Sequence, residues 1–318
     1  MTRLVAVFGA TGAQGGGLVR AALADPGRRF RVRAVTRKPD SAGALALRDA
    51  GADVVAADLD DAASVERAMR GADAAYCVTN FWEHFSPAKE IAQARTMAEA
   101  AARTGVKHVV WSTLEDTRTF VKPGTAGWKT LGDGYLVPHF DAKGEANAFF
   151  LASGVPTTLF HTSFYWDNLV HFGMQPQRGD DGVLQFVLPM GDAKLPGIAA
   201  ADIGACAYAI LARGDEFAGR SVGVAGEHLT GAQMAEQLSQ ALGEPVRHAA
   251  LSTEQYAALG FPGADDLANM FKFKHDFERT YCESRSVERT RALHPGVRTF
   301  AQWLAENAKR MPIAPRQR

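Results

Sequence analysis

Residues 4–16 read LVAVFGATGAQGG, a short apolar run that leads into closely spaced glycines. The apolar run at 4–8 stops at Gly9, as expected for a strand that is buried on both faces of a parallel sheet. Residues 14–24 then carry apolar side chains at helical spacing, and Asp-Pro-Gly at 25–27 ends that helix. The stretch therefore predicts a strand, a glycine-rich turn and a helix in immediate succession.

The same alternation continues along the chain. Strands separated by helices indicate right-handed βαβ crossovers, and so an α/β fold with a doubly wound parallel Rossmann sheet and a smaller C-terminal α/β lobe. We expect residues 1–157 to form a Rossmann domain that binds NADP, and residues 158–318 to complete the sheet and form the smaller substrate or partner lobe. The further strands are predicted at 30–35, 53–57, 73–78, 107–112 and 156–160, and the main helices at 87–104, 139–152, 202–212, 231–242 and 299–309.

The glycines follow the pattern GxxGxxG directly after the first strand, at the start of a helix. Without side chains, the backbone can turn tightly and approach a pyrophosphate, while the helix N-terminus offers unpaired N–H groups and a positive dipole end. The alternative is a glycine turn with only a packing role. The loop residues predicted to bind a dinucleotide are Gly9, Ala10, Thr11, Gly12, Ala13, Gln14 and Gly15.

The end of the second strand distinguishes the two nicotinamide cofactors. A carboxylate at this position accepts from the ribose 2′-hydroxyl of NAD, whereas an arginine accommodates the 2′-phosphate of NADP. The sequence reads Val-Thr-Arg-Lys-Pro at 35–39, with no acidic residue before Asp40. Arg37 and Lys38 therefore predict NADP(H), and a charge-assisted hydrogen bond from Arg37 favours it by roughly 10- to 100-fold. A solvated basic turn is the alternative.

Two further strand ends carry candidate cofactor contacts, because ligands of doubly wound sheets lie at the carboxyl edge. Asp58 follows the third strand, where it is placed either to accept from the adenine amino group or to cap the helix that begins near residue 61. The fourth strand is followed by Thr79, Asn80, Phe81 and Trp82. These predict a wall beside the cofactor, or aromatic rings that fill the interface between the lobes.

Composition excludes several other classes of protein. The 318 residues include 35 basic and 35 acidic side chains, so no global field attracts nucleic acid or an anionic membrane. No window approaches the roughly 20 apolar residues of a membrane span. The three cysteines are far apart and lack metal-ligand spacing, and the N-terminus leads directly into a strand. We therefore expect a cytoplasmic protein without metal, membrane or direct nucleic-acid binding.

Five segments together resemble the NmrA-like atypical members of the short-chain dehydrogenase/reductase superfamily, and within them the HSCARG-like NADPH-sensor proteins. The resemblance implies a Rossmann domain and a smaller lobe with NADP in the cleft between them, and it makes a homodimer plausible. Members of this kind act as cofactor-responsive regulators that bind other proteins, while more distant relatives are NADPH-dependent reductases. The segments are VFGATGAQGG at 7–16, RVRAVTRKP at 31–39, VTNFWE at 78–83, HFDAKGE at 139–145 and FPGADDLANMFKF at 261–273.

By the same resemblance, this sequence lacks the tyrosine of the superfamily's catalytic motif. Active members of the superfamily carry Tyr-x-x-x-Lys, in which lysine holds the nicotinamide ribose and lowers the tyrosine pKa, and the equivalent pair here is His139 and Lys143. A neighbouring cation disfavours charging His139, and a neutral imidazole is a poor proton donor. Lys143 is predicted to bind cofactor, or else to be a solvated helix lysine. His139 is a tentative catalytic residue, a polar pocket contact or only the start of a helix.

Two later segments leave alternatives open. Tyr165, Trp166 and Asn168 resemble the family pattern, which implies that they border the nicotinamide, but an aromatic pair at 165–166 is equally expected in a core. The Met and Phe side chains at 261–273 are expected either in the core or on a surface for the cleft or partners.

The leading hypothesis is an NADP(H)-binding regulator in which cofactor orders the 123–134 loop and the 78–83 segment and so shifts binding of a protein partner. The alternative is an NADPH-dependent oxidoreductase that acts on a small carbonyl, enone or quinone.

Overall fold

The computed structural model describes residues 2–314, which fall into two compact units. The first unit contains the chain up to Val121 together with Pro138–Thr162 and Ala201–Gly223. The second contains Lys122–Val137, Ser163–Ala200 and the chain from Val224 onward. Each unit is built from segments that are separated in the sequence.

The first unit is organised around a seven-stranded parallel sheet with the order β11-β6-β5-β4-β1-β2-β3. Strand β1 lies inside the sheet, where Val5 is in register with Val32 on one side and Ala74 on the other. Buried apolar side chains fill both faces of this strand, as expected for a central parallel strand. The strands are β1 (Arg3–Val7), β2 (Phe30–Thr36), β3 (Asp53–Ala56), β4 (Ala74–Cys77), β5 (His108–Thr113), β6 (Thr157–His161) and β11 (Ser221–Gly223).

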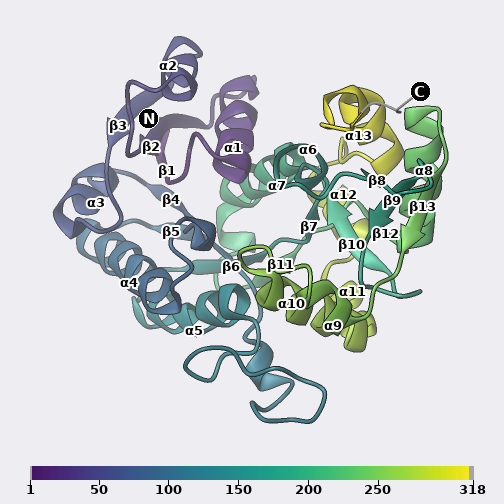
Figure 1. Cartoon of the computed structure of the whole chain (residues 1–318). Helices are drawn as coiled ribbons and strands as arrows, with labels where there is room; N and C mark the ends of the chain where they lie inside the picture. Colours follow the sequence, from purple (N-terminus) through teal and green to yellow (C-terminus); the bar gives the residue numbers. More distant parts are fainter. Residues whose placement is uncertain (1, 315–318) are drawn as a thin grey trace. The chain divides into compact units, whose positions relative to one another are not determined.

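Helices cover both faces of this sheet (Figure 1). On one face α3, α4 and α5 pack side by side, and α1 and α7 lie on the other face. Helix α4 begins at Pro87 because the Ser86 side chain accepts from the backbone N–H of Lys89, and it ends where Gly105 adopts a left-handed conformation. The helices are α1 (Ala13–Ala24), α2 (Ala42–Asp49), α3 (Ala62–Met69), α4 (Pro87–Thr104), α5 (Pro138–Ala152) and α7 (Ala200–Arg213), with short 3₁₀ helices η1 (Phe81–Glu83), η2 (Thr117–Thr119) and η3 (Gly214–Glu216).

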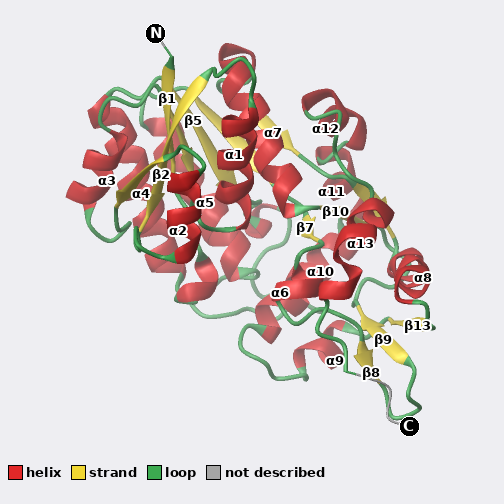
Figure 2. Cartoon of the chain, turned by 90° about the horizontal axis from the view of Figure 1, so that it is seen from above, coloured by secondary structure: helices red, strands yellow, loops and turns green. Residues whose placement is uncertain are grey.

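The second unit has two three-stranded sheets, with the orders β12-β10-β7 and β13-β9-β8. Figure 2 shows β8, β9 and β13 side by side. The strands are β7 (Phe164–Tyr165), β8 (Gln177–Arg178), β9 (Leu184–Val187), β10 (Leu195–Ile198), β12 (Glu227–Leu229) and β13 (Val246–Ala249). The helices are α6 (Asn168–His171), α8 (Gly231–Leu242), α9 (Thr253–Ala257), α10 (Ala264–Asp276), α11 (Glu278–Ser284), α12 (Val287–Leu293), α13 (Phe300–Asn307) and η4 (Ala308–Arg310).

The predicted α/β fold with a doubly wound parallel sheet is confirmed, and so are the six predicted strands of the first unit. Residues 201–223 of the predicted C-terminal region contribute α7 and β11 to the first unit, whereas the 122–137 loop belongs to the second. The division of roles on either side of residue 157 stays a prediction. Within residues 2–314, the structure contains no helix whose length and apolar character would let it cross a membrane.

The segment at 261–273 is mainly core. Leu267, Met270, Phe271 and Phe273 are buried in α10, whereas Phe261 precedes the helix and is partly exposed. The 122–137 loop is attached to this helix, because Asn269 Nδ2 donates to the carbonyl oxygens of Lys129 and Leu136 at 2.7 Å each. The core alternative is therefore correct for Met270, Phe271 and Phe273 and wrong for Phe261.

Candidate functional site

The glycine loop turns so tightly that one of its glycines cannot carry a side chain. The N–H of Gly12 donates to the carbonyl oxygen of Gly9 at 2.9 Å, which closes the turn. A Cβ atom on Gly15 would lie 2.4 Å from that same carbonyl oxygen. Gly12 is the N-cap of α1 and has no side chain to cover the first amides of the helix. The loop thus exposes residues 11–13 beside a helix N-terminus, the arrangement that suits a pyrophosphate.

Gln14 connects this loop to the ends of two neighbouring strands. Its Oε1 accepts from the Ser112 hydroxyl at the end of β5, at 2.8 Å, and from the Tyr76 hydroxyl on β4. Two donors on one oxygen fix the side-chain amide in orientation. Gln14 therefore positions the first turn of α1 over the carboxyl edge of the sheet, and Ser112 is engaged as a donor to it.

The end of β2 carries an exposed ion pair. Arg37 Nη2 lies 2.6 Å from Oε1 of Glu83, which belongs to η1 after β4, and the two side chains are 54% and 44% exposed. Lys38 is also exposed. The structure therefore places the predicted guanidinium at the strand end, but with a carboxylate partner that the sequence analysis did not identify.

The structure after β3 tests the capping role predicted for Asp58. The side chain of Asp61, and not that of Asp58, caps α3 by accepting from the N–H groups of Ala63 and Ser64. The capping interpretation of Asp58 is therefore wrong, because its Oδ1 instead accepts from the N–H of Asp60 at 3.0 Å. The exposed Asp58 keeps its predicted contact with adenine as a prediction.

Beside it, Asp60 is joined to α4. Its oxygens lie 2.7 Å from Lys89 Nζ and 2.9 Å from Gln93 Nε2. These hydrogen bonds lower the pKa of Asp60, the one from Lys89 most strongly. The loop after β3 is thereby attached to the first turns of α4.

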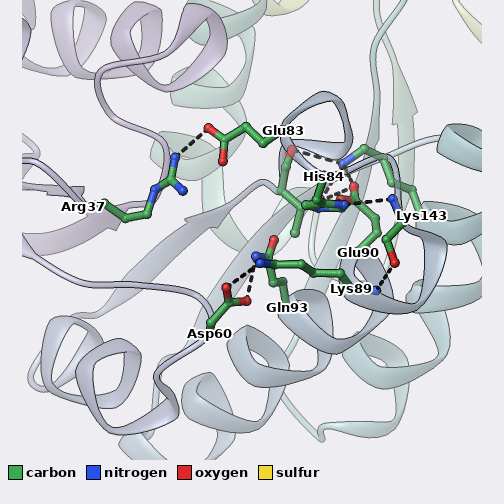
Figure 3. A network of polar contacts seen from close by, with 10 residues as sticks. Arg37, Asp60, Glu83, His84, Lys89, Glu90, Gln93 and Lys143 are labelled. Carbon is green, nitrogen blue, oxygen red and sulfur yellow. Dashed lines mark hydrogen bonds and ion pairs between the residues drawn. The ribbon is translucent and has the colours of Figure 1, made fainter. Parts of the chain in front are cut away.

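A buried charged cluster brings together His84, Glu90 and Lys143 (Figure 3). Lys143 Nζ lies 2.6 Å from Glu90 Oε1 and 2.6 Å from the Thr79 hydroxyl oxygen. The Thr79 hydroxyl donates to Glu90 Oε1 at 2.5 Å, so its oxygen is free to accept from Lys143. Burial by itself would raise the pKa of the fully buried Glu90. The Lys143 charge, the hydrogen bonds from Lys143 and Thr79 and the nearby His84 ring outweigh that effect and lower the pKa to about 2.

His84 completes the cluster on the other carboxylate oxygen. Its Nδ1 accepts from the backbone N–H of Ser86 at 3.1 Å, so the ring carries its proton on Nε2. That nitrogen lies 3.4 Å from Glu90 Oε2. Glu90 thus faces Lys143 and Thr79 with one oxygen and His84 with the other.

His139 lies among aromatic rings. It is 6% exposed, and its ring centroid is 4.7 Å from that of Trp82, 4.8 Å from Phe140 and 6.0 Å from Phe81. His139 and Lys143 share α5 as predicted, and Lys143 contacts oxygens of Glu90 and Thr79. Asn80 precedes these rings as the exposed N-cap of η1.

The HFDAKGE segment has a second, structural use. Asp141 is buried, and its Oδ1 accepts from the backbone N–H and the hydroxyl of Thr117 at 2.8 and 2.6 Å. A Cβ atom on Gly144 would lie 2.4 Å from the backbone nitrogen of Asp116. These two residues therefore hold the chain after β5 close against α5.

A family model described as the NmrA-like family matches residues 1–304. This chain belongs to the NmrA-like family. The resemblance inferred from the five sequence segments is confirmed.

Relatives within and around the NmrA-like family differ in what their names describe. The NmrA-like family domain-containing oxidoreductase lnbB of Aspergillus flavus is 28% identical over 292 residues, which cover 85% of this chain and 83% of the relative. The (4-alkanoyl-5-oxo-2,5-dihydrofuran-3-yl)methyl phosphate reductase of Streptomyces griseus is 30% identical over 310 residues, 96% of this chain and 98% of the relative. The structure of NmrA, a negative transcriptional regulator, in complex with NADP matches with a TM-score of 0.78 and 21% identity, over 97% of this chain and 96% of that one. At this identity the structural likeness supports the fold.

The other two predicted site residues of this NmrA-like chain lie in the second unit. Tyr165 is in β7, where it pairs with Ile198 of β10, and Asn168 begins α6. The neighbouring Trp166 is 1% exposed and packs against Phe300, so the core interpretation holds for that ring. The roles of Tyr165 and Asn168 toward a cofactor stay predictions.

Sequence analysis missed the carboxylates that partner the predicted cations. Glu83 and Glu90 come from segments that are distant in sequence from Arg37 and Lys143. For Glu90 a signal exists in the sequence, because it stands on the buried stripe of α4 with Ala94, Met97 and Ala101. A carboxylate on an apolar helix stripe requires a buried cation.

Proposed function

We propose that this protein binds NADP(H) on the carboxyl edge of its seven-stranded sheet and acts as a regulator that responds to the cofactor. The observation that carries the proposal is the GxxGxxG turn at a helix N-terminus together with a guanidinium at the end of β2. The backbone N–H groups of Thr11 and Ala13 would hold the pyrophosphate, and Arg37 with Lys38 would hold the 2′-phosphate. The NADP complex of NmrA, which has the same fold, supports this assignment.

The arrangement around α5 supports regulation over catalysis. His139 stands where the superfamily carries its tyrosine, and it is packed against Trp82, Phe140 and Phe81. The charge of Lys143 is compensated by the buried Glu90. Hydride transfer to or from nicotinamide would need a proton donor, and the tyrosine that serves the superfamily is replaced by His139. We infer that occupancy of the site, rather than turnover, is the output.

Calorimetric titration with NADPH, NADP+ and NADH tests the binding step. We expect NADPH and NADP+ to bind and NADH to bind roughly 10- to 100-fold more weakly. Arg37→Ala should remove most of this preference. Arg67→Ala is the matched control, since Arg67 is an exposed arginine paired with Asp61 on α3. Equal binding of NADPH to the wild type and Arg37→Ala would refute the 2′-phosphate assignment.

A protein partner is the second element of the proposal. We propose that cofactor occupancy changes the 78–83 segment and the 123–134 loop, and that a partner discriminates between the two states. Limited proteolysis with and without NADPH tests this, and indifference of both segments to cofactor would count against regulation. A cytoplasmic location and a homodimer remain part of the proposal.

The second candidate is an NADPH-dependent reductase, which the names of the two relatives favour. Consumption of NADPH is the assay, with enones, quinones, aldehydes and a butenolide phosphate as substrates. If a substrate is turned over and His139→Phe reduces the rate of NADPH consumption, the reductase hypothesis would replace the regulator hypothesis. Absence of turnover with intact NADPH binding is the outcome that we expect.

A further inference from the structure

The guanidinium at the end of β2 already has an anionic ligand from the protein itself. Glu83 Oε1 lies 2.6 Å from Arg37 Nη2, and the side chains are about half exposed. A carboxylate at this distance makes the same charge-assisted hydrogen bond that a phosphate oxygen would make. Figure 3 shows this pair on one side of η1, away from the Glu90 cluster.

A phosphate on the ribose 2′-oxygen carries a charge of about −1.5 to −2 at neutral pH. Placed on Arg37, it would lie beside the Glu83 carboxylate, and like charges at such separations repel. Binding of a 2′-phosphorylated nucleotide therefore favours movement of Glu83 off the guanidinium. NAD(H), which lacks this phosphate, imposes no such exchange.

The segment that carries Glu83 is under backbone strain. Phe85, directly after η1 and His84, has a φ of +53°, a left-handed conformation that bulky side chains rarely adopt. The same short segment provides Phe81 and Trp82, which pack against His139. Glu83, which contacts Arg37, and the rings that pack around His139 thus belong to one strained segment of six residues, 80–85.

We propose that Glu83 is an internal competitor for the 2′-phosphate subsite, and that its exchange for the phosphate releases η1 and changes the surroundings of Trp82. This inference rests on the proposed binding of NADP(H) and names the residue that couples binding to a conformational response. Glu83 lowers the affinity for 2′-phosphorylated nucleotides and leaves the affinity for NAD(H) unaffected.

The first test compares Glu83→Gln with the wild type by calorimetry. Glutamine keeps the size of the side chain but removes its charge, so NADPH should bind about 2- to 10-fold more tightly, because an exposed ion pair no longer competes and a like charge is gone. NADH affinity should stay within about twofold. Glu99→Gln is the matched control, since Glu99 and Arg103 form an ion pair on α4 with exposures of 53% and 46%, and it should change neither affinity.

Three results of this titration have different meanings. If NADPH binds the Glu83→Gln protein no more tightly than the wild type, or if NADPH and NADH both gain equally, the competitor role is refuted while NADP(H) binding stands. If the wild type binds neither nucleotide, the proposed function fails, and this inference fails with it.

The second test isolates the 2′-phosphate. Adenosine 2′,5′-bisphosphate carries that group without a nicotinamide, and 5′-AMP lacks it. We expect the bisphosphate alone to change the tryptophan fluorescence of the wild type, 5′-AMP to leave it unchanged, and Trp82→Phe to abolish the change. An equal response to both nucleotides, or a response that persists in Trp82→Phe, would refute the coupling through η1.

Discussion

Replacing Glu90 by glutamine should be among the most destabilising single changes in the first unit. The Glu90 carboxylate is fully buried, and its pKa of about 2 stands against an ordinary value of 4.5. A lowering of this size corresponds to about 3 kcal/mol of free energy of unfolding at neutral pH. This agrees with the roughly 3–5 kcal/mol that removal of one partner from a buried ion pair costs. Glu90→Gln leaves Lys143 buried and uncompensated.

The pH dependence has a definite sign. The folded-state pKa is lowered, so the unfolded state takes up the proton first as the pH falls. The advantage of the wild type over Glu90→Gln should be complete above about pH 5.5, and should diminish as the pH falls from 4.5 toward 2. Urea unfolding followed by far-ultraviolet circular dichroism, at pH 7 and at steps below pH 5, measures this.

Two further variants decide whether the ion pair is the cause. Glu99→Gln removes an exposed carboxylate from the same helix and should cost no more than about 0.5 kcal/mol. Adding Lys143→Met to Glu90→Gln should restore part of the loss, because the unpaired charge is gone. A loss below about 1 kcal/mol in Glu90→Gln, or strictly additive losses in the double variant, would refute the reasoning.

Three other predictions follow from the close approaches and the thiols. Gly15→Ala should lower stability by about 1–3 kcal/mol and weaken NADPH binding more than tenfold in calorimetry, because the new methyl group would meet the Gly9 carbonyl; tight NADPH binding by this variant would contradict the role of the loop. Gly144→Ala should lower the free energy of unfolding in urea by about 1–3 kcal/mol. Gly43→Ala is the control and should not be destabilised, because its added Cβ would have its nearest neighbour at 3.8 Å. Burial raises the pKa values of the thiols of Cys77 and Cys206, and it raises the pKa of the Cys282 thiol to about 11. Ellman's reagent at pH 8 should therefore react slowly with the native protein and quickly with three thiols in denaturant. Rapid modification of the native protein would contradict this prediction.

The fold was predictable because its determinants are local. The six predicted strands of the first unit are short runs rich in apolar and β-branched residues, and their alternation with helices indicates a parallel sheet. Strand β11, with the sequence SVG, lacks this signal and was not predicted. Arg37 was found for the same reason, since its position at a strand end can be read without knowing its neighbours.

The partners of the cations were less accessible to sequence reasoning. Glu83 lies 46 residues from Arg37, and Lys143 reaches Thr79 across 64 residues. Spacing within one helix indicated that His139 and Lys143 would share a face, but the aromatic rings and the carboxylate around them come from other elements. In the same way, Asp58 and Asp61 both suit a helix cap by residue type, and only the backbone path after β3 selects Asp61.

The Lys143–Glu90 pair also limits how this chain can change over generations. A mutation that puts tyrosine at position 139 would supply a phenol, yet the lysine four residues on would still be neutralised by an interior acid. Loss of Glu90 first would leave the Lys143 charge uncompensated in the protein interior. The intermediate with this single change would fold poorly. Descendants should therefore replace positions 90 and 143 together.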